Sequence, residues 1–303
     1  MTEIAAVQVA TTDAYVLAEG PCWDDRRGRL LWVDIESGLV LCGELADDGT
    51  LGVVHRVEFD GRVGAVAPAE NGDWIVALDG RLVRRRPTGE VAVGVEVVAA
   101  GSGRRLNDGR PDPAGRYVVG SLRMDGASES EVLVVVDDRG IRTLDADLSL
   151  SNGLAWSTDG GTLYSIDTGR RTVFRRSWDV ATGASGTREV HVTLTHGHPD
   201  GMTIDAEDHL WIAVWGLGQV HRYSPAGDLV RVIDVPAPFT SSVAFAGADL
   251  ATLVITTSYR DLDDVGRTRY PDSGRLFTVR PGVAGAPQPL WSGRLPPARE
   301  GTS

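Results

Sequence analysis

Residues 198–213 read HPDGMTIDAEDHLWIA, and this stretch decides the fold. It predicts a tight turn, a short apolar strand that begins near Asp200, a polar turn, and a second apolar strand over residues 210–213. Similar phrases recur along the chain about every 45 residues, which is the length of one four-stranded propeller blade. The copies are marked by Gly20, Gly64, Gly109, Gly153, Gly201 and, more weakly, Val243.

The rest of the composition agrees with this repeat. The chain of 303 residues contains 37 glycines and few long helical patterns, which favours many short strands and turns. Its strands are apolar on both faces, as stacked sheets require. We therefore predict an all-β, six-bladed β-propeller that forms a single domain over residues 1–303. Residues 1–18 are expected to supply an outer strand that closes the ring, and residues 295–303 to form a flexible tail.

Net charge and cysteine content narrow the classes of function. The formal net charge of −12 makes nucleic acid an unfavourable partner, and no apolar run approaches the length of a membrane span. Cys22 and Cys42 are the only cysteines, and we expect buried, reduced thiols. The first residues lack the basic and apolar regions of a signal peptide, so we expect a cytoplasmic protein.

The repeat register predicts which side chains meet in the ring. The first strand of each propeller blade lines the central channel, so residues in equivalent positions form a ring at one end of it. The residues directly before the six markers are Glu19, Val63, Asp108, Asn152, Asp200 and Ser242. Four of these six side chains are strong oxygen donors.

Glu19, Asn152 and Asp200 form the predicted metal-binding set. Two carboxylates and an amide oxygen are ligands that hard cations prefer, so calcium, magnesium or manganese fits this set better than zinc. Singly, each residue is also compatible with a structural role, because acidic and amide side chains before glycine often cap turns. Together, such groups in one narrow channel would repel one another and lose hydration unless a cation joined them.

Several phrases, in order and at the right spacing, resemble the SMP-30/gluconolactonase/LRE family, which includes regucalcin and bacterial sugar lactonases. The similarity runs from about Leu17 to Val279. Its specific points are AEGPCW from residue 18, RLNDGRPD from 105, SNGLAWS from 151, PDGM from 199, TSY from 257 and SGRLF from 273. Members of this family are six-bladed propellers.

The resemblance implies roles for particular residues. Glu19, Asn152 and Asp200 would hold one catalytic divalent metal ion, with calcium favoured and zinc, magnesium or manganese as alternatives, and Asp200 would also act as general base. Arg105 and Asn107 would contact substrate, and Asp108 matches a position that is sometimes tied to a second ion. Alternatively, Arg105 pairs with a nearby carboxylate, and residues 107–109 form a turn.

One departure from the family pattern concerns the substrate. Family members that bind sugar lactones often carry Glu shortly after the strand that here ends in residues 118–122. Met124 falls at that position, so either Asp125 substitutes for the Glu or the pocket is more apolar and its substrate less hydroxylated.

The implied reaction is hydrolysis of a lactone, in which a metal-polarised carbonyl is attacked by water with help from Asp200. A phosphotriesterase, another esterase, or a non-catalytic calcium-binding propeller are the alternatives. No Gly-x-Ser-x-Gly nucleophile motif occurs. His196 and His198 flank Asp200, and we expect solvent exposure or substrate contact for them rather than metal ligation. The sequence does not determine the oligomeric state.

Overall fold

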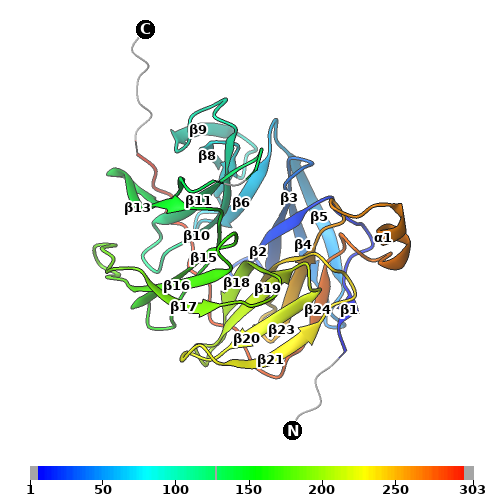
Figure 1. Ribbon diagram of the computed structural model, residues 1–303. Coiled ribbons are helices and arrows are strands. Elements are labelled where there is room, and N and C mark those ends of the chain that lie inside the picture. Colours follow the sequence, from blue (N-terminus) through cyan, green and yellow to red (C-terminus); the bar gives the residue numbers. More distant parts are fainter. Residues whose placement is uncertain (1–5, 127, 297–303) are drawn as a thin grey trace.

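The computed structural model describes residues 6–126 and 128–296. Six antiparallel four-stranded sheets are arranged as blades around a central channel (Figure 1). The innermost strands of neighbouring sheets contact one another in a closed ring. The prediction of an all-β, six-bladed propeller is therefore confirmed. In the described ranges, no helix is both long and apolar enough to cross a membrane.

The first three blades follow one another along the chain, each running from the channel outward. The first contains β2 (Ala18–Asp24), β3 (Arg29–Asp34), β4 (Leu39–Leu45) and β5 (Leu51–Glu58). The second contains β6 (Val63–Pro68), β7 (Trp74–Leu78), β8 (Arg81–Arg85) and β9 (Val91–Glu96). The third contains β10 (Arg104–Pro111), β11 (Tyr117–Arg123), β12 (Glu131–Asp137) and β13 (Gly140–Leu148).

The last three blades repeat this order and complete the ring. The fourth contains β14 (Ser151–Trp156), β15 (Thr162–Asp167), β16 (Thr172–Ser177) and β17 (Glu189–Thr193). The fifth contains β18 (His198–Ile204), β19 (Leu210–Trp215), β20 (Gln219–Tyr223) and β21 (Leu229–Asp234). The sixth contains β22 (Thr240–Ala246), β23 (Thr252–Thr257), β24 (Phe277–Val279) and β1 (Gln8–Val9).

The N-terminal end of the described chain is tied into this ring. Strand β1 pairs antiparallel with β24, so a segment from the N-terminal part of the chain forms the outer strand of the last blade. A short helix, α1 (Asp264–Arg269), lies in the connection between β23 and β24 and projects from the side of the propeller (Figure 1).

After β24 the chain crosses the face of the propeller at which the inner strands end. The backbone N–H of Ala286 donates to the carbonyl of Ile204, and that of Trp291 donates to the carbonyl of Pro68. Trp291 is almost fully buried and belongs to the apolar cluster between the second and third blades, against which Leu295 also packs. Leu295 is the first residue of the predicted flexible tail, 295–303, of which residues 297–303 lie outside the described residues.

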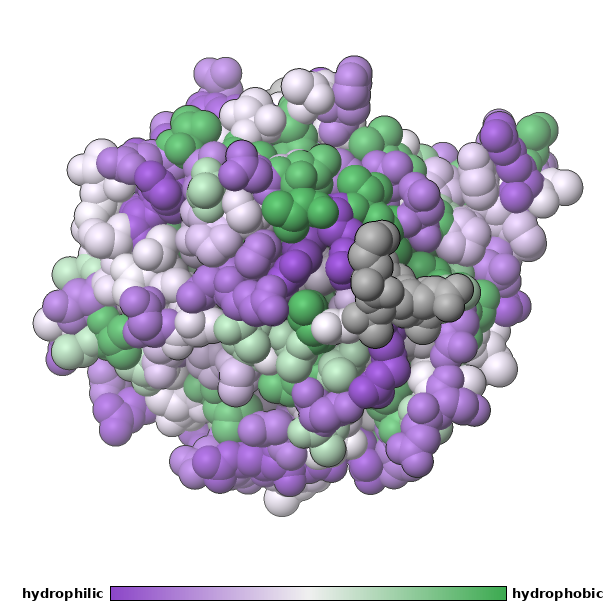
Figure 2. Space-filling view, turned by 90° about the horizontal axis from the view of Figure 1, so that it is seen from below, coloured by the Kyte–Doolittle hydropathy of each residue, from purple (hydrophilic) through white to green (hydrophobic). Residues whose placement is uncertain are grey.

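The apolar core consists of clusters between adjacent blades, because both faces of each sheet are covered. In one cluster, Trp211 of β19 packs edge-on against Phe245 of β22, with ring centroids 5.8 Å apart. Cys22 and Cys42 are free and buried, as expected. On the surface, hydrophilic residues are interspersed with smaller hydrophobic areas across the face seen in Figure 2.

Three of the five marker glycines, Gly64, Gly153 and Gly201, lie where inner strands of neighbouring blades come close together. A Cβ atom on Gly64 would lie 2.5 Å from the carbonyl oxygen of Leu106, and one on Gly153 would lie 2.6 Å from that of Asp200. Real Cβ atoms do not approach backbone so closely, because van der Waals repulsion is steep at that range. At these three positions the glycine is therefore required by the close packing of neighbouring blades.

Each innermost strand pair also has a register shift at its marker. Such irregularities bend a strand and redirect its side chains. Asn107, Asn152 and Asp200 lie within three of these shifts. These three side chains therefore point into the channel because the pairing of the two innermost strands is locally irregular.

We predict that Gly153→Ala destabilises the protein by about 1–3 kcal/mol, the usual cost of overpacking a closely packed interior. The matched control is Gly52→Ala in β5, where an added Cβ would have no neighbour within 4 Å. The control should change the free energy of unfolding by less than about 0.5 kcal/mol. Urea denaturation measures both values, and equal stabilities would contradict this account of the repeat.

Candidate metal centre and substrate cavity

A cavity of about 270 Å³ opens at the end of the channel where the inner strands begin. We call it the entrance cavity. Four inner strands contribute to its wall, and the structure brings five of the predicted site residues together there. These residues are Glu19 of β2, Arg105 and Asn107 of β10, Asn152 of β14 and Asp200 of β18.

Glu19 and Asp200 are the acidic groups of this cavity, and both are buried, with 8% and 6% of their surface exposed. Burial raises the pKa of Glu19 to about 8, and the nearby Asp108 carboxylate contributes to this rise. Burial also raises the pKa of Asp200 well above its usual value, helped by the charges of Glu19 and Asp108. The carboxylates thus repel one another in a site that hydrates them poorly.

The amide of Asn152 is oriented by Thr168. Its Nδ2 donates to Thr168 Oγ1 at 3.1 Å, and that hydroxyl donates to the carbonyl of Pro199 at 2.8 Å. With the amide nitrogen engaged, Asn152 Oδ1 is left as the free acceptor. This oxygen is buried without a hydrogen-bond partner, and so is Asp200 Oδ1.

These oxygen atoms fit a hard divalent cation. A carboxylate and an amide oxygen, both buried and unpartnered, lie beside a second buried carboxylate, and a cation would relieve both the repulsion and the lost hydration. In the described part of the chain, no three His, Cys, Asp or Glu side chains converge as a metal-binding group. The candidate site therefore depends on Asn152 as its third ligand.

Asp108 lies on the opposite side of the ligand set. Its Oδ1 accepts a hydrogen bond from Gly109 N at 2.8 Å, and its Oδ2 is buried without a partner. The side chain does not line the entrance cavity. Together with Cys22 and Arg110 it lines a separate chamber of about 390 Å³ farther along the inner strands. A second ion at Asp108 remains a prediction.

Arg105 and Asn107 form a connected pair in the wall of the entrance cavity. Arg105 Nη1 donates to Asn107 Oδ1 at 2.7 Å and to the carbonyl of Leu106 at 2.9 Å. Asn107 Nδ2 donates to the carbonyl of Ser151 at 3.0 Å, which ties β10 to the strand that carries Asn152. The alternative in which Arg105 forms an ion pair is not observed in the described part of the chain.

Met124 and Asp125 are not brought into the entrance cavity. Met124 is 48% exposed, and its sulfur lies 3.8 Å from Arg62 Nη1. Asp125 pairs with Arg123 at 2.6 Å, outside the cavity. Leu122, the residue two positions earlier, lines the cavity instead, since β11 ends at Arg123 and the chain turns away there.

Of the histidines and tryptophans considered for the site, one of each lines the entrance cavity. His198 lines the entrance cavity, with Nδ1 3.4 Å from the carbonyl of Thr168, whereas His196 is exposed. Trp215 also lines the cavity and packs against Phe239, with ring centroids 4.7 Å apart. Trp23 is buried in the core.

Sequence analysis missed a set of aspartates that anchor the segments leading into the inner strands. Asp34, at the end of β3, accepts a hydrogen bond from Leu17 N at 3.0 Å, two residues before Glu19. Asp167, at the end of β15, accepts from Ser149 N at 3.1 Å and Leu150 N at 3.4 Å, just before Asn152. In the sequence, these aspartates could have been recognised because an Asp recurs at the end of the second strand of a blade.

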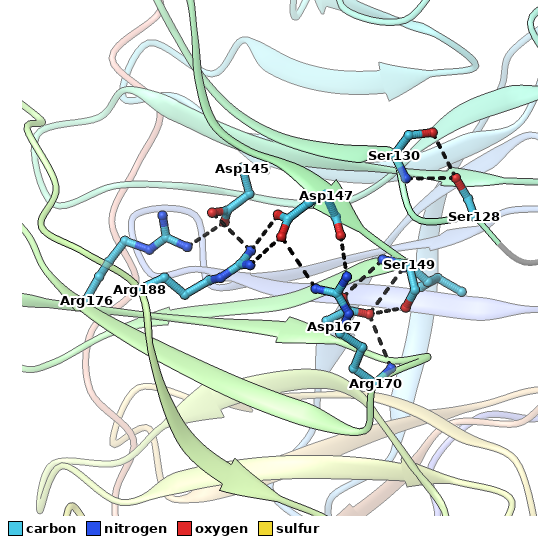
Figure 3. A network of polar contacts seen from close by, with 10 residues as sticks. Ser128, Ser130, Asp145, Asp147, Ser149, Asp167, Arg170, Arg176 and Arg188 are labelled. Atoms are coloured by element: carbon cyan, nitrogen blue, oxygen red, sulfur yellow. Dashed lines mark hydrogen bonds and ion pairs between the residues drawn. The ribbon is translucent and has the colours of Figure 1, made fainter.

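Asp167 is also the last member of an ion network between the third and fourth blades. In order, the network passes through Arg176, Asp145, Arg188, Asp147, Arg170 and Asp167 (Figure 3). Asp145 and Arg176 are both buried, and their ion pair is 2.5 Å long. The network therefore links the third and fourth blades beside the segment that leads to Asn152.

Comparison with known proteins agrees with this architecture. The SMP-30/Gluconolactonase/LRE-like region matches residues 17–259, and the chain belongs to this family. The chain is 33% identical to the pentonolactonase XacC of Haloferax volcanii, covering 90% of this chain and 93% of that protein. It is 29% identical to regucalcin of Gallus gallus, covering 95% and 98% of the two chains.

A solved structure is similar over nearly the whole chain. Regucalcin from Agrobacterium tumefaciens, described as a calcium-binding protein, superimposes with a TM-score of 0.88 at 30% identity. The match covers 95% of this chain and 97% of that one. The resemblance inferred from the sequence motifs is therefore confirmed.

We predict that Asp167→Ala lowers the free energy of unfolding by about 1–2 kcal/mol, because it removes the acceptor of two partly buried backbone donors. Asp228→Ala is the control, since Asp228 lies in an exposed turn and contacts only Ser224. Chemical denaturation of both variants measures the difference. If Asp167→Ala is no less stable than the control, the anchoring role is wrong.

Proposed function

We propose that this protein is a divalent-metal-dependent lactonase that opens a sugar lactone by attack of water on its carbonyl. The observation that carries the proposal is the convergence of Glu19, Asn152 and Asp200 beside Arg105 in one cavity. Membership of the SMP-30/Gluconolactonase/LRE-like family, and the lactonase activity named for the Haloferax relative, support the same reaction class.

Glu19, Asn152 and Asp200 are the proposed metal ligands, with calcium as the favoured ion. A divalent cation held there would polarise the lactone carbonyl and stabilise the negative charge that develops on its oxygen. The calcium binding described for the Agrobacterium structure supports this choice of ion.

Asp200 is the proposed general base. Its carboxylate would orient the attacking water and accept a proton from it during the attack. A carboxylate beside a cation is a weak base, but water in the same field also loses its proton more easily, so the transfer stays feasible. Asp200 Oδ1 is buried and has no hydrogen-bond partner among the described residues, which supports its role as the acceptor.

Arg105 and Asn107 are the proposed substrate contacts. Asn107 is held by the β14 backbone and in turn holds one nitrogen of the guanidinium. The other guanidinium nitrogens of Arg105 can donate to oxygen atoms of the lactone. Such fixed donors orient the carbonyl carbon toward the water that Asp200 holds.

We expect that adding calcium to chelator-treated protein raises its melting temperature, because a ligand that binds only the folded state stabilises it. Glu19→Gln should reduce this rise, since it removes one ligand charge. Glu90→Gln, in an exposed turn, is the matched control and should respond like the original protein. Differential scanning fluorimetry with calcium, magnesium and manganese tests the site without requiring activity. An undiminished rise in Glu19→Gln would exclude Glu19 as a ligand.

We expect that Asp200→Asn folds but loses about 10²–10⁴-fold in kcat on lactone substrates, the typical contribution of a general base. The substitution keeps the size of the side chain and removes its basicity. Asp228→Asn is the surface control. Turnover followed by acid release on a panel of sugar lactones measures the effect, and an unchanged kcat would remove Asp200 from the mechanism.

A further inference from the structure

Three arginines surround the entrance cavity, although the protein as a whole carries a net charge of −12. Arg105 and Arg260 line the cavity directly. Arg62 lies at its rim, where Arg62 and Arg260 pair with the same carboxylate, Glu36, at 2.9 Å and 3.6 Å. Three guanidinium groups thus gather at this mouth, where Glu36 is the shared carboxylate partner of two of them.

Arg105 is the cation that lacks a counter-ion. Only 5% of its surface is exposed, and its Nη1 bonds to two neutral acceptors, the carbonyl of Leu106 and the amide oxygen of Asn107. Among the residues that the structure describes, no carboxylate forms an ion pair with it. A buried charge without a partner is costly, so such a side chain in a cavity wall is a binding feature for an anion.

All but one of the charged groups around the cavity can be matched with a group of opposite charge. The Glu19 and Asp200 carboxylates together balance one divalent cation. The rim cations Arg62 and Arg260 are matched by Glu36 and by Asp261, whose Oδ1 lies 3.0 Å from Arg260 Nε. The guanidinium of Arg105 has no ion-pair partner among these groups, and a single negative charge on the substrate would balance it.

The rim arginines are held in place by their surroundings. The backbone N–H of Arg260 bonds to the carbonyl of Val16 at 3.1 Å and to Ser258 Oγ at 3.0 Å. Its guanidinium carbon lies 5.6 Å from the ring centre of Trp215, in the range of a cation–π contact. Arg62 N bonds to Asp79 Oδ1 at 3.0 Å. The backbones of both residues are therefore anchored at the mouth, and the Arg260 guanidinium is also positioned by Trp215.

We propose that the substrate is a lactone with a negatively charged substituent, such as a second carboxylate, rather than a neutral sugar lactone. Arg105 would bind that group through its free guanidinium nitrogens, because the planar guanidinium matches the two oxygens of a carboxylate. Arg260 and Arg62 would attract it to the mouth of the cavity. This inference rests on the proposed lactonase function.

Matched pairs of lactones test the inference. In each pair, an aldonic acid lactone is compared with the lactone of the corresponding aldaric acid, which carries a carboxylate in place of the terminal CH2OH group. Pairs derived from pentoses and hexoses of several configurations are measured with metal-loaded protein. We expect kcat/KM to be at least about tenfold higher for the charged member of the preferred pair, as a charge-assisted hydrogen bond would give. The preference should weaken as salt concentration rises.

Arg260→Gln provides the residue-level test. We expect it to lower the ratio of charged to neutral kcat/KM about three- to tenfold, mainly through a higher KM for the charged lactone, as loss of a partly exposed ion pair predicts. The matched control is Arg269→Gln in α1, whose guanidinium lies over Tyr270 and does not line the cavity. The control should keep the original ratio.

The outcomes separate this inference from the proposed function. Turnover of neutral lactones equal to or faster than that of their charged partners would overturn the inference and leave the lactonase function standing. An unchanged ratio in Arg260→Gln would remove Arg260 from substrate recognition. Absence of turnover for every lactone, with any of the divalent ions, would instead overturn the proposed function itself.

Discussion

Neighbouring inner strands come closest at Gly64, Gly153 and Gly201, and the site depends on this contact. No Cβ fits at Gly64 or Gly153, because a carbonyl of the adjacent strand occupies that space. Since the six strands can approach so closely, the channel is narrow, and residues far apart in sequence reach one another across it. The register shift beside each contact then turns Asn152 and Asp200 toward the channel. Close packing of the ring and convergence of the oxygen side chains therefore have one cause.

Electrostatics determines what this narrow channel can hold. Burial raises the pKa of Glu19 and of Asp200, and the charge of Glu19 raises that of Asp200 further, so a cation would be favourable beside them. On the cavity side of the same site, Arg105 is a buried cation without an ion pair in the described chain. The proposed metal centre and the proposed substrate pocket thus favour charges of opposite sign, positive at the carboxylates and negative at Arg105.

The contacts that support the candidate site come from residues outside the repeated phrases. Thr168 selects which atom of Asn152 is free, and Asp167 anchors the segment before β14 while ending an ion network that joins two blades. Arg260 belongs to the connection that carries α1, and its backbone is held by the segment before β2. Each of these contacts joins residues whose relation follows from three-dimensional packing rather than from periodicity.

The sequence by itself determined the propeller, the number of its blades and the grouping of Glu19, Asn152 and Asp200, because a repeat of constant length places equivalent residues at equivalent positions of a closed ring. The order and spacing of its motifs determined the family. The sequence did not show that Leu122, rather than Met124 or Asp125, lines the cavity, since the direction of the chain beyond β11 depends on loop geometry. Only the tertiary structure decided that Asp108 faces a separate chamber, that Arg105 lacks a carboxylate partner, and that Arg62 and Arg260 share Glu36 at the mouth. These features depend on distances between side chains of different blades, which the order of residues along the chain does not specify.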